Sequence, residues 1–357
     1  MSVFIGHKYG AAYMALAHSN ETHVSLRALL QFLSPLIEFG GAGVVVFFLV
    51  SGYVITHVLQ REPVGVFLMR RFFRIYPLYA AAVLISALAS PARPSAAVLL
   101  QQLSLFGDFM QTPHALGGVD WTLRIEVLFY LFMAMIKGVG LIDGARAPWL
   151  PLVVLLAALG LSVAPRVPGS WSETWCYGYL NLYGPFLLLG VMFRLHDVGR
   201  VTRGECAAIA ALLLVAHWIA LPLVQPQGIQ SHFTAAGLAV FVALWQLRAS
   251  LHIGAFGLLL SELTYPVYLF HNWLYDPLLA AVGRYVSVPG LQHACAVALL
   301  FIFCWLTVRL IERPAIRLGQ VLSRRVRKQD SNSASPVRHA DTSISSPSTQ
   351  ALQNADR

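Results

Sequence analysis

The stretch GAGVVVFFLVSGYVITHVL runs from Gly41 to Leu59 without a single Asp, Glu, Lys or Arg. A transmembrane helix needs about 20 consecutive, predominantly apolar residues to cross the hydrocarbon core of a bilayer. This segment is long and apolar enough, so it predicts a spanning helix and decides the class of the fold. Similar apolar runs recur along most of the chain.

The composition of the whole chain is that of a membrane protein. Hydrophobic residues make up 57% of the sequence and charged residues 11%, whereas a soluble domain carries about 25% charged residues. Because so few charges cannot cover a water-exposed surface, we predict an all-α, polytopic transmembrane bundle of about 9–11 helices. The expected spans are Gly41–Leu59, Ile75–Ala89, Trp121–Ile142, Trp149–Ala164, Tyr179–Leu195, Cys206–Val224, Phe233–Leu247, Leu258–Val282 and Leu291–Ile311.

The first stretch, Ser2–Ala17, is mildly apolar and is interrupted by His7 and Lys8. It is interpreted as the remainder of a helix whose beginning is absent. A cleavable signal peptide is the alternative interpretation. The stretch lacks a basic region ahead of an apolar run and a small-residue cleavage site, which argues against that alternative.

Basic residues gather in five clusters. The clusters lie at Arg61–Arg74, Lys137–Arg146, Arg194–Arg203, near Arg248 and at Arg309–Lys328. With the expected helices all five fall on one face of the membrane, and Lys and Arg in short loops are retained on the cytoplasmic side. The net charge of +9 therefore indicates topology and contact with anionic lipid head groups, not nucleic-acid binding.

The chain is predicted to divide into a transmembrane domain at 1–314 and a tail at 315–357. After Pro314 a basic run gives way to a Ser-rich segment that is nearly free of aromatic residues. Such a segment cannot bury enough apolar surface to fold, so we predict a disordered cytoplasmic tail. The four cysteines lack metal-ligand spacing, and neither a metal site nor a disulfide framework is predicted.

Three ionisable side chains lie in apolar stretches, where each costs roughly 2.5–3.5 kcal/mol on insertion scales. They are His7, Glu126 and His271, and the last lies in the middle of an expected helix. Such a group either serves function or forms a hydrogen bond between helices of the bundle. For Glu126 the structural alternative is an ion pair with Arg124 or another arginine.

Arg70, Arg71 and Arg74 alternate with aromatic residues at the entry of the expected helix Ile75–Ala89. This pattern is typical of arginines that anchor a helix at the cytoplasmic surface. A guanidinium also pairs well with phosphate, so the same arginines are candidates to hold a nucleotide-type phosphate group. Spacing alone favours the anchor over the ligand.

Five blocks of sequence, in a common order, resemble the membrane-bound acyltransferase-3 family, which includes bacterial O-antigen and exopolysaccharide O-acetyltransferases. The third block, for example, matches the family pattern Trp-Ser/Thr-Leu-x-x-Glu-x-x-Phe-Tyr. The resemblance extends over residues 5–314. The blocks are Gly43–Tyr53, Arg70–Tyr79, Trp121–Tyr130, Tyr265–His271 and Glu312–Pro314.

Two positions depart from the family pattern. Val45 stands where relatives usually carry an aspartate. His7 fits the position of the family's first-helix histidine, but the chain begins too late to include the arginine that precedes it in relatives. Either the start of this chain is internal to a longer protein, or this copy is a degenerate relative.

The resemblance implies an integral membrane O-acyltransferase. It would move an acetyl or other short acyl group from acyl-CoA to a hydroxyl of a cell-surface or lipid-linked carbohydrate, such as exopolysaccharide or O-antigen. Acetyl-CoA is expected as a donor substrate, with no permanently bound cofactor. The implied location is the bacterial inner membrane, with several passes and a cytoplasmic C-terminal tail. A polytopic glycan or lipid transporter or flippase, and a catalytically degenerate relative, are the alternatives.

The resemblance assigns the general base for this reaction to His7, since histidine titrates nearest neutral pH. A carboxylate bonded to the other imidazole nitrogen would fix the tautomer and raise basicity, and Glu126 is the candidate. His271 is the alternative for either role, or donates to the developing oxyanion together with Tyr268. The expected acyl-CoA ligands are Arg70, Arg71 and Arg74, and the expected substrate-binding residues are Trp121, Tyr265, Tyr268 and Ser51.

Overall fold

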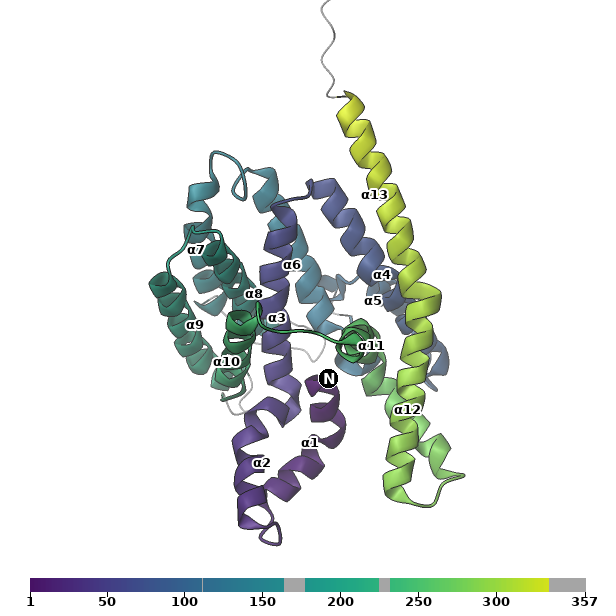
Figure 1. Cartoon of the computed structure of the whole chain (residues 1–357). Coiled ribbons are helices and arrows are strands. Elements are labelled where there is room, and N and C mark those ends of the chain that lie inside the picture. Colours follow the sequence, from purple (N-terminus) through teal and green to yellow (C-terminus); the bar gives the residue numbers. More distant parts are fainter. Residues whose placement is uncertain (111, 164–176, 225–231, 334–357) are drawn as a thin grey trace, which may run out of the picture.

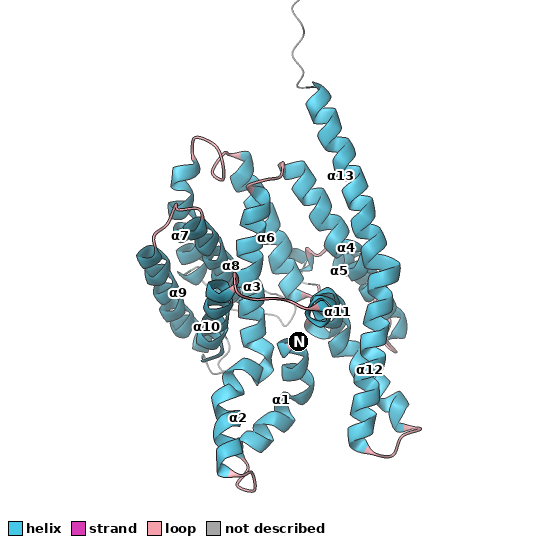
Figure 2. Cartoon of the chain, in the orientation of Figure 1, coloured by secondary structure: helices cyan, strands magenta, loops and turns pink. Residues whose placement is uncertain are grey.

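The computed structural model describes residues 1–110, 112–163, 177–224 and 232–333. Within these ranges the protein is all-helical, as predicted, and contains no strand (Figure 2). The α-helices are α1 (Ser2–His18), α2 (Val24–Ile37), α3 (Gly41–Leu59), α4 (Val64–Ala89), α5 (Ala96–Leu103), α6 (Trp121–Gly138), α7 (Leu150–Val163), α8 (Tyr177–Asp197), α9 (Arg203–Val224), α10 (His232–Leu247), α11 (Ala255–Gly283), α12 (Pro289–Thr307) and α13 (Arg313–Ser333). Short helical turns are η1 (Glu38–Gly40), η2 (Gly107–Met110), η3 (Leu116–Gly118), η4 (Ala147–Trp149) and η5 (Val308–Glu312).

Among the residues that the structure describes, three helical segments are long and apolar enough to cross a membrane, as expected of a membrane protein. They are α3, α4 and the 38-residue stretch Pro289–Val326. Figure 1 shows this last stretch as one rod in which α13 continues the direction of α12. The short helix η5 joins the two parts.

Each of the nine expected spans overlaps an α-helix, namely α3, α4 and α6–α12, although several bounds differ. The tail is different from the prediction, because the chain continues as helix α13 to Ser333 instead of losing its order after Pro314. Packing on α4 explains this helix: a Cβ added to Gly319 would lie 2.7 Å from the Cβ of Phe73. Residues 334–357 of the predicted tail lie outside the described residues.

The core is built around the crossing of α3 and α8. A Cβ at Gly52 would lie 1.9 Å from the carbonyl oxygen of Leu187, and one at Gly190 would lie 2.2 Å from that of Leu49. Only glycine permits such a close approach of two helix backbones, a device common in membrane bundles. α10 packs on another part of α3, and α7 packs on α8 (Figure 1).

Basic residues from distant parts of the chain meet at one end of the bundle. Lys137 Nζ donates a hydrogen bond to the Leu59 carbonyl at 2.7 Å, and Arg194 Nε donates to Gln60 Oε1 at 2.8 Å. Further links are Arg200 to the Ile142 carbonyl at 2.8 Å, Arg248 to Asp197 at 3.0 Å and Arg70 to Ser323 at 3.2 Å. We call this the basic end; α3, α6, α8 and α10 finish there, so their first residues lie at the opposite end.

Candidate active site

Two histidines that are far apart in the sequence form a hydrogen-bonded pair. His7 on α1 and His271 in the middle of α11 are joined by a 3.0 Å bond between His7 Nδ1 and His271 Nε2. The His271 side chain is fully buried, whereas His7 is exposed. The structure therefore brings together both histidines that the sequence had singled out.

The backbone around His271 fixes the direction of this hydrogen bond. His271 Nδ1 lies 2.9 Å from the Tyr268 carbonyl oxygen and 3.1 Å from that of Val267. Carbonyl oxygens only accept, so Nδ1 carries the ring proton and Nε2 of the neutral ring is an acceptor. His7 Nδ1–H then donates to His271, and His7 keeps a lone pair on Nε2, for which the described residues supply no hydrogen-bond partner.

Contacts on both sides of the pair hold α1 against α11. Lys8 Nζ lies 2.7 Å from Asp276 and donates to the Asn272 carbonyl at 2.9 Å. The hydroxyls of Tyr9 and Tyr275 are 2.5 Å apart. Because these bonds flank His7 in the sequence, they set the register of α1 on α11 and hence the meeting of the two imidazoles.

Glu126 does not play the part expected of it beside His7. Its Oε1 accepts a 2.8 Å hydrogen bond from Ser51 and a 2.5 Å hydrogen bond from Tyr130. Both partners belong to α3 and α6 rather than to α1, so the predicted carboxylate–His7 contact is absent among the described residues. The position next to His7 is taken by His271 instead.

A cavity of about 920 Å³ lies among α1, α3, α4, α6 and α11. Its walls are largely apolar, as is usual for small-molecule sites, with a few charged or imidazole groups. Those groups are Arg71, Arg74, Glu126 and His271, and Ser51 lines the same cavity. Glu126 and His271 therefore face one common space although they do not touch.

Two of the three predicted phosphate-binding arginines line this large cavity. They are Arg71, whose guanidinium also lies over the Tyr130 ring at 5.8 Å from its centroid, and Arg74, which pairs with Glu312 at 2.6 Å. Arg70 is not among the lining residues. It pairs with Glu62 and donates to Ser323, because its side chain is directed toward the α3–α4 connection and α13.

A second, smaller pocket of about 150 Å³ adjoins the large cavity and is lined by His7. Aromatic rings form much of its wall, with Trp121 stacked on Tyr179 at a centroid distance of 4.6 Å. Tyr268 lines both spaces. The histidine pair thus bridges two cavities, since His271 lies on the large one and His7 on the small one.

The two tyrosines predicted to bind substrate are tied to the backbone by their hydroxyls. Tyr265 donates to the Ile75 carbonyl at 2.8 Å, and Tyr268 donates to the Val119 carbonyl at 2.8 Å. Tyr268 also lies 2.7 Å from the Thr122 hydroxyl. In this arrangement both tyrosines form walls of the large cavity, and the hydroxyl proton of Tyr268 is directed at Val119.

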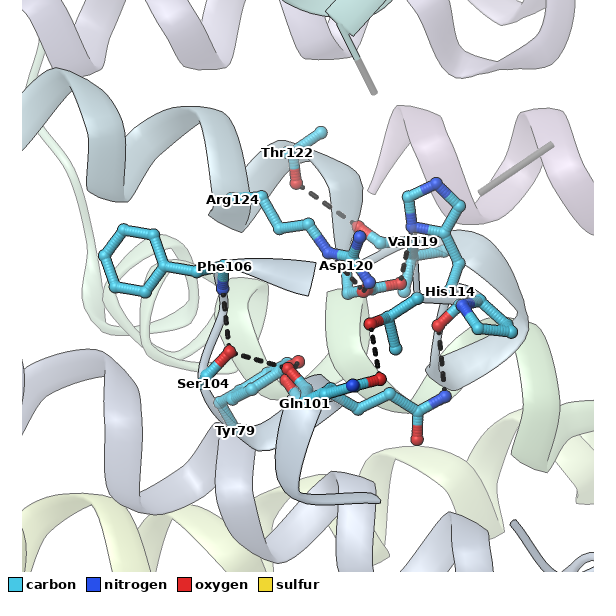
Figure 3. A network of polar contacts seen from close by, with 12 residues as sticks. Tyr79, Gln101, Ser104, Phe106, His114, Val119, Asp120, Thr122 and Arg124 are labelled. Atoms are coloured by element: carbon cyan, nitrogen blue, oxygen red, sulfur yellow. Dashed lines mark hydrogen bonds and ion pairs between the residues drawn. The ribbon is translucent and has the colours of Figure 1, made fainter. Parts of the chain in front are cut away.

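Sequence reasoning missed a sealed polar network at the start of α6 (Figure 3). Arg124 pairs with Asp120 at 2.8 Å, and His114 Nδ1 lies 3.4 Å from the other Asp120 oxygen. Asp120 is 0% exposed and Arg124 1%. The spacing of four residues was a usable signal, but Arg124 had been considered only as a partner for Glu126.

This network supports the turn on which α11 rests. Asp120 follows η3, a turn in which Leu116, Gly117 and Gly118 all have positive φ. The Gly117 carbonyl accepts a 2.6 Å bond from Asn272, and the Val119 carbonyl accepts the Tyr268 hydroxyl. The residues on either side of His271 are therefore fixed to this turn.

The departure at Val45 does not alter either cavity wall. Val45 is fully buried and faces α10. A Cβ added to Gly237 of α10 would lie 2.9 Å from the Cβ of Val45. Val45 is not among the lining residues of either cavity, although its neighbour Val44 lines both. The valine is a packing residue in this chain.

Comparisons with known proteins match the sequence of this chain to a family. A model of the family described as acyltransferase domain matches residues 1–309. Acyltransferase MdmB of Streptomyces mycarofaciens is 29% identical over 230 residues, and the match covers 57% of this chain and 57% of that protein. Nodulation protein 10 of Rhizobium leguminosarum bv. viciae is 25% identical over 338 residues, covering 78% of this chain and 83% of that protein. No solved structure matches the chain.

Proposed function

The chain belongs to the membrane-bound acyltransferase-3 family and is an acyltransferase, and from this premise we propose its reaction. It transfers an acetyl or other short acyl group from acyl-CoA to a hydroxyl of a cell-surface or lipid-linked carbohydrate. The protein acts as a multi-pass protein of the inner membrane, with its C-terminal end in the cytoplasm. The transporter alternative loses its basis because the chain is an enzyme.

The observation that carries the proposal is the histidine pair between two cavities. His7 lines the small pocket and its Nε2 has a lone pair, while His271 lies on the wall of the large cavity. A base on the small pocket, paired with a second imidazole on the wall of the large cavity, can take a proton from a hydroxyl in the small pocket while the large cavity holds a thioester. Proton transfer by such a positioned imidazole accelerates a reaction by about 10²–10⁴-fold.

In the proposed reaction His7 Nε2 removes the proton of the acceptor hydroxyl. The hydroxyl oxygen then attacks the thioester carbonyl carbon, the C–S bond breaks, and the CoA thiolate leaves and takes the proton from His7. His271 acts as a positioning residue, since its Nε2 accepts from His7 Nδ1–H and stabilises the imidazolium that forms. It thereby takes the role that an aspartate has in a catalytic triad.

The large cavity suits the acyl donor. Arg71 and Arg74 lie in the first part of α4, which begins near the basic end of the bundle. A guanidinium matches a phosphate in charge and geometry, and the apolar walls suit an acyl arm. Lys and Arg clusters are retained in the cytoplasm, so the basic end faces the compartment that contains acyl-CoA.

Ester analysis of envelope glycans tests this function. We expect a strain lacking the gene to keep its glycans but to lose O-acyl esters, detected by mass spectrometry of the isolated polysaccharide. A plasmid copy should restore the esters, and a copy carrying His7→Ala should not. Unchanged esters in the deletion strain, or loss of a whole glycan, would contradict the proposed reaction.

A further inference from the structure

We propose that the small pocket beside His7 is the acceptor site and that it holds a single sugar ring, with Tyr179 and Trp121 as its aromatic wall and Glu38 as its hydrogen-bond acceptor. The inference rests on the proposed function and names the group that this pocket recognises. It starts from the position of the pocket, because the base His7 is one of its lining residues.

The chemistry of the wall matches a sugar. A pyranose presents C–H bonds on its faces and hydroxyls at its rim, so it binds where a flat aromatic surface meets a few polar groups. Tyr179 and Trp121 provide the flat surface. Glu38 and His7 provide the polar groups, and both of them accept hydrogen bonds from hydroxyls.

Glu38 has no structural task that competes with this role. It lies in η1, between α2 and α3, and its side chain is partly exposed. Among the described residues no hydrogen bond or ion pair engages its carboxylate, although His232 interacts with it electrostatically. Glu62 and Glu312, by contrast, are each paired with an arginine. A carboxylate that faces a pocket and has no hydrogen-bond partner among the described residues is suited to accept from a ligand hydroxyl.

Size and position agree with a single ring. The volume of about 150 Å³ is small beside the 920 Å³ of the large cavity, so it admits one ring and excludes a folded glycan. Gly41, Trp121, Tyr179 and Phe233 belong to the first turns of α3, α6, α8 and α10, at the end opposite the basic end. Donor and acceptor therefore approach the histidine pair from opposite ends of the bundle.

Saturation-transfer NMR on the full-length protein in detergent micelles tests the site without depending on turnover. The probes are methyl glycosides of common hexoses, added singly. We expect at least one of them to show saturable binding, with the strongest saturation on the ring C–H protons that face Tyr179. Tyr179→Ala and Glu38→Gln should each weaken its affinity by about tenfold, the loss of one stacking or charge-assisted contact.

Matched controls separate the pocket from general effects. Tyr285→Ala removes a tyrosine that is 90% exposed in the α11–α12 connection, and Glu21→Gln alters an exposed carboxylate between α1 and α2. Both should leave glycoside affinity unchanged. Circular dichroism shows whether each variant is folded.

The outcomes distinguish this proposal from the proposed function. If no glycoside binds saturably, or if Tyr179→Ala and Glu38→Gln bind as well as the wild type, the sugar site is overturned, even where envelope esters still depend on the gene. If glycosides bind as expected but the esters do not depend on the gene, the pocket stands and the proposed reaction fails.

Discussion

One polar pair lies between α1 and α11 and another lies below the turn on which α11 rests, and the two pairs differ in access. His7 and His271 form a pair of which one member is exposed and both line cavities. Asp120 and Arg124 form a pair that is sealed, with 0% and 1% of their surfaces exposed. A polar group placed in a membrane protein is costly, so each pair needs a reason to be there. A substrate can reach the histidine pair, which can therefore react, whereas the sealed Asp120–Arg124 pair can only hold the neighbouring structure in place.

Replacement of His7 by alanine should have the largest effect. We expect the rate of acyl transfer to fall by about 10²–10⁴-fold with folding intact, because the base is lost and His7 contributes little to the core. The measurement is transfer of radiolabelled acetyl groups from acetyl-CoA to the isolated glycan. His18→Ala, an exposed histidine at the end of the same helix, is the control and should leave the rate unchanged.

Replacement of Arg124 by methionine should lower the stability of the fold. An uncompensated Asp120 would remain buried, so the free energy of unfolding should fall by about 3–5 kcal/mol. Chemical denaturation in detergent measures this loss, and Asp120→Leu combined with Arg124→Met should recover part of it. A variant that unfolds normally but no longer transfers acyl groups would instead assign the sealed pair to the chemistry.

The arginines of α4 show a similar contrast, between a side chain that faces a cavity and one that is already paired. Arg71 lines the large cavity, whereas Arg70 is paired with Glu62. We expect Arg71→Ala to weaken acyl-CoA binding by about tenfold or more, because one charge-assisted contact to phosphate is lost. Arg70→Ala should bind acyl-CoA nearly as the wild type does. Isothermal titration calorimetry measures both, and unchanged acyl-CoA binding in Arg71→Ala would indicate simple membrane anchoring.

The pair of Lys8 and Asp276 should show the smallest effect. The Asp276 side chain is 67% exposed, and Lys8 keeps its bond to the Asn272 carbonyl when the carboxylate is removed. Asp276→Asn should therefore change the free energy of unfolding by less than about 1 kcal/mol. A large loss of transfer rate in this variant would show that the register of α1 depends on a single exposed contact.

Much of the fold could be predicted because apolar length is a local property. α3 begins at Gly41 and ends at Leu59, the bounds that its sequence indicated. The helices that escaped prediction depend on neighbours. α2 contains Arg27 and Gln31 and buries no residue, and α13 is polar overall but packs one face on α4. α2 is apolar but has only 14 residues, which is too short for a span, and α13 is too polar to be recognised as one. The partners of both helices are known only from the tertiary structure.

The sequence identified the histidines of the site but not the hydrogen bond between them. His7 and His271 were recognisable because each is an expensive group in an apolar stretch. Their contact joins residues 264 positions apart, and no local pattern specifies which helices become neighbours. For the same reason the sequence alone led us to expect a bond between Glu126 and His7. In the structure α3 lies beside α6, and Glu126 accepts a hydrogen bond from Ser51 instead. The assignment of roles therefore required the arrangement of the helices.

The central claim is that the two histidines act as one unit, with His7 as the base. A double-mutant cycle on the transfer rate tests it directly, with His7→Ala, His271→Ala and the double variant, each checked for folding. We predict that the double variant is no slower than His7→Ala alone, since residues that act as a unit are strongly non-additive. Rate losses that multiply, or undiminished transfer in folded His7→Ala, would contradict the account.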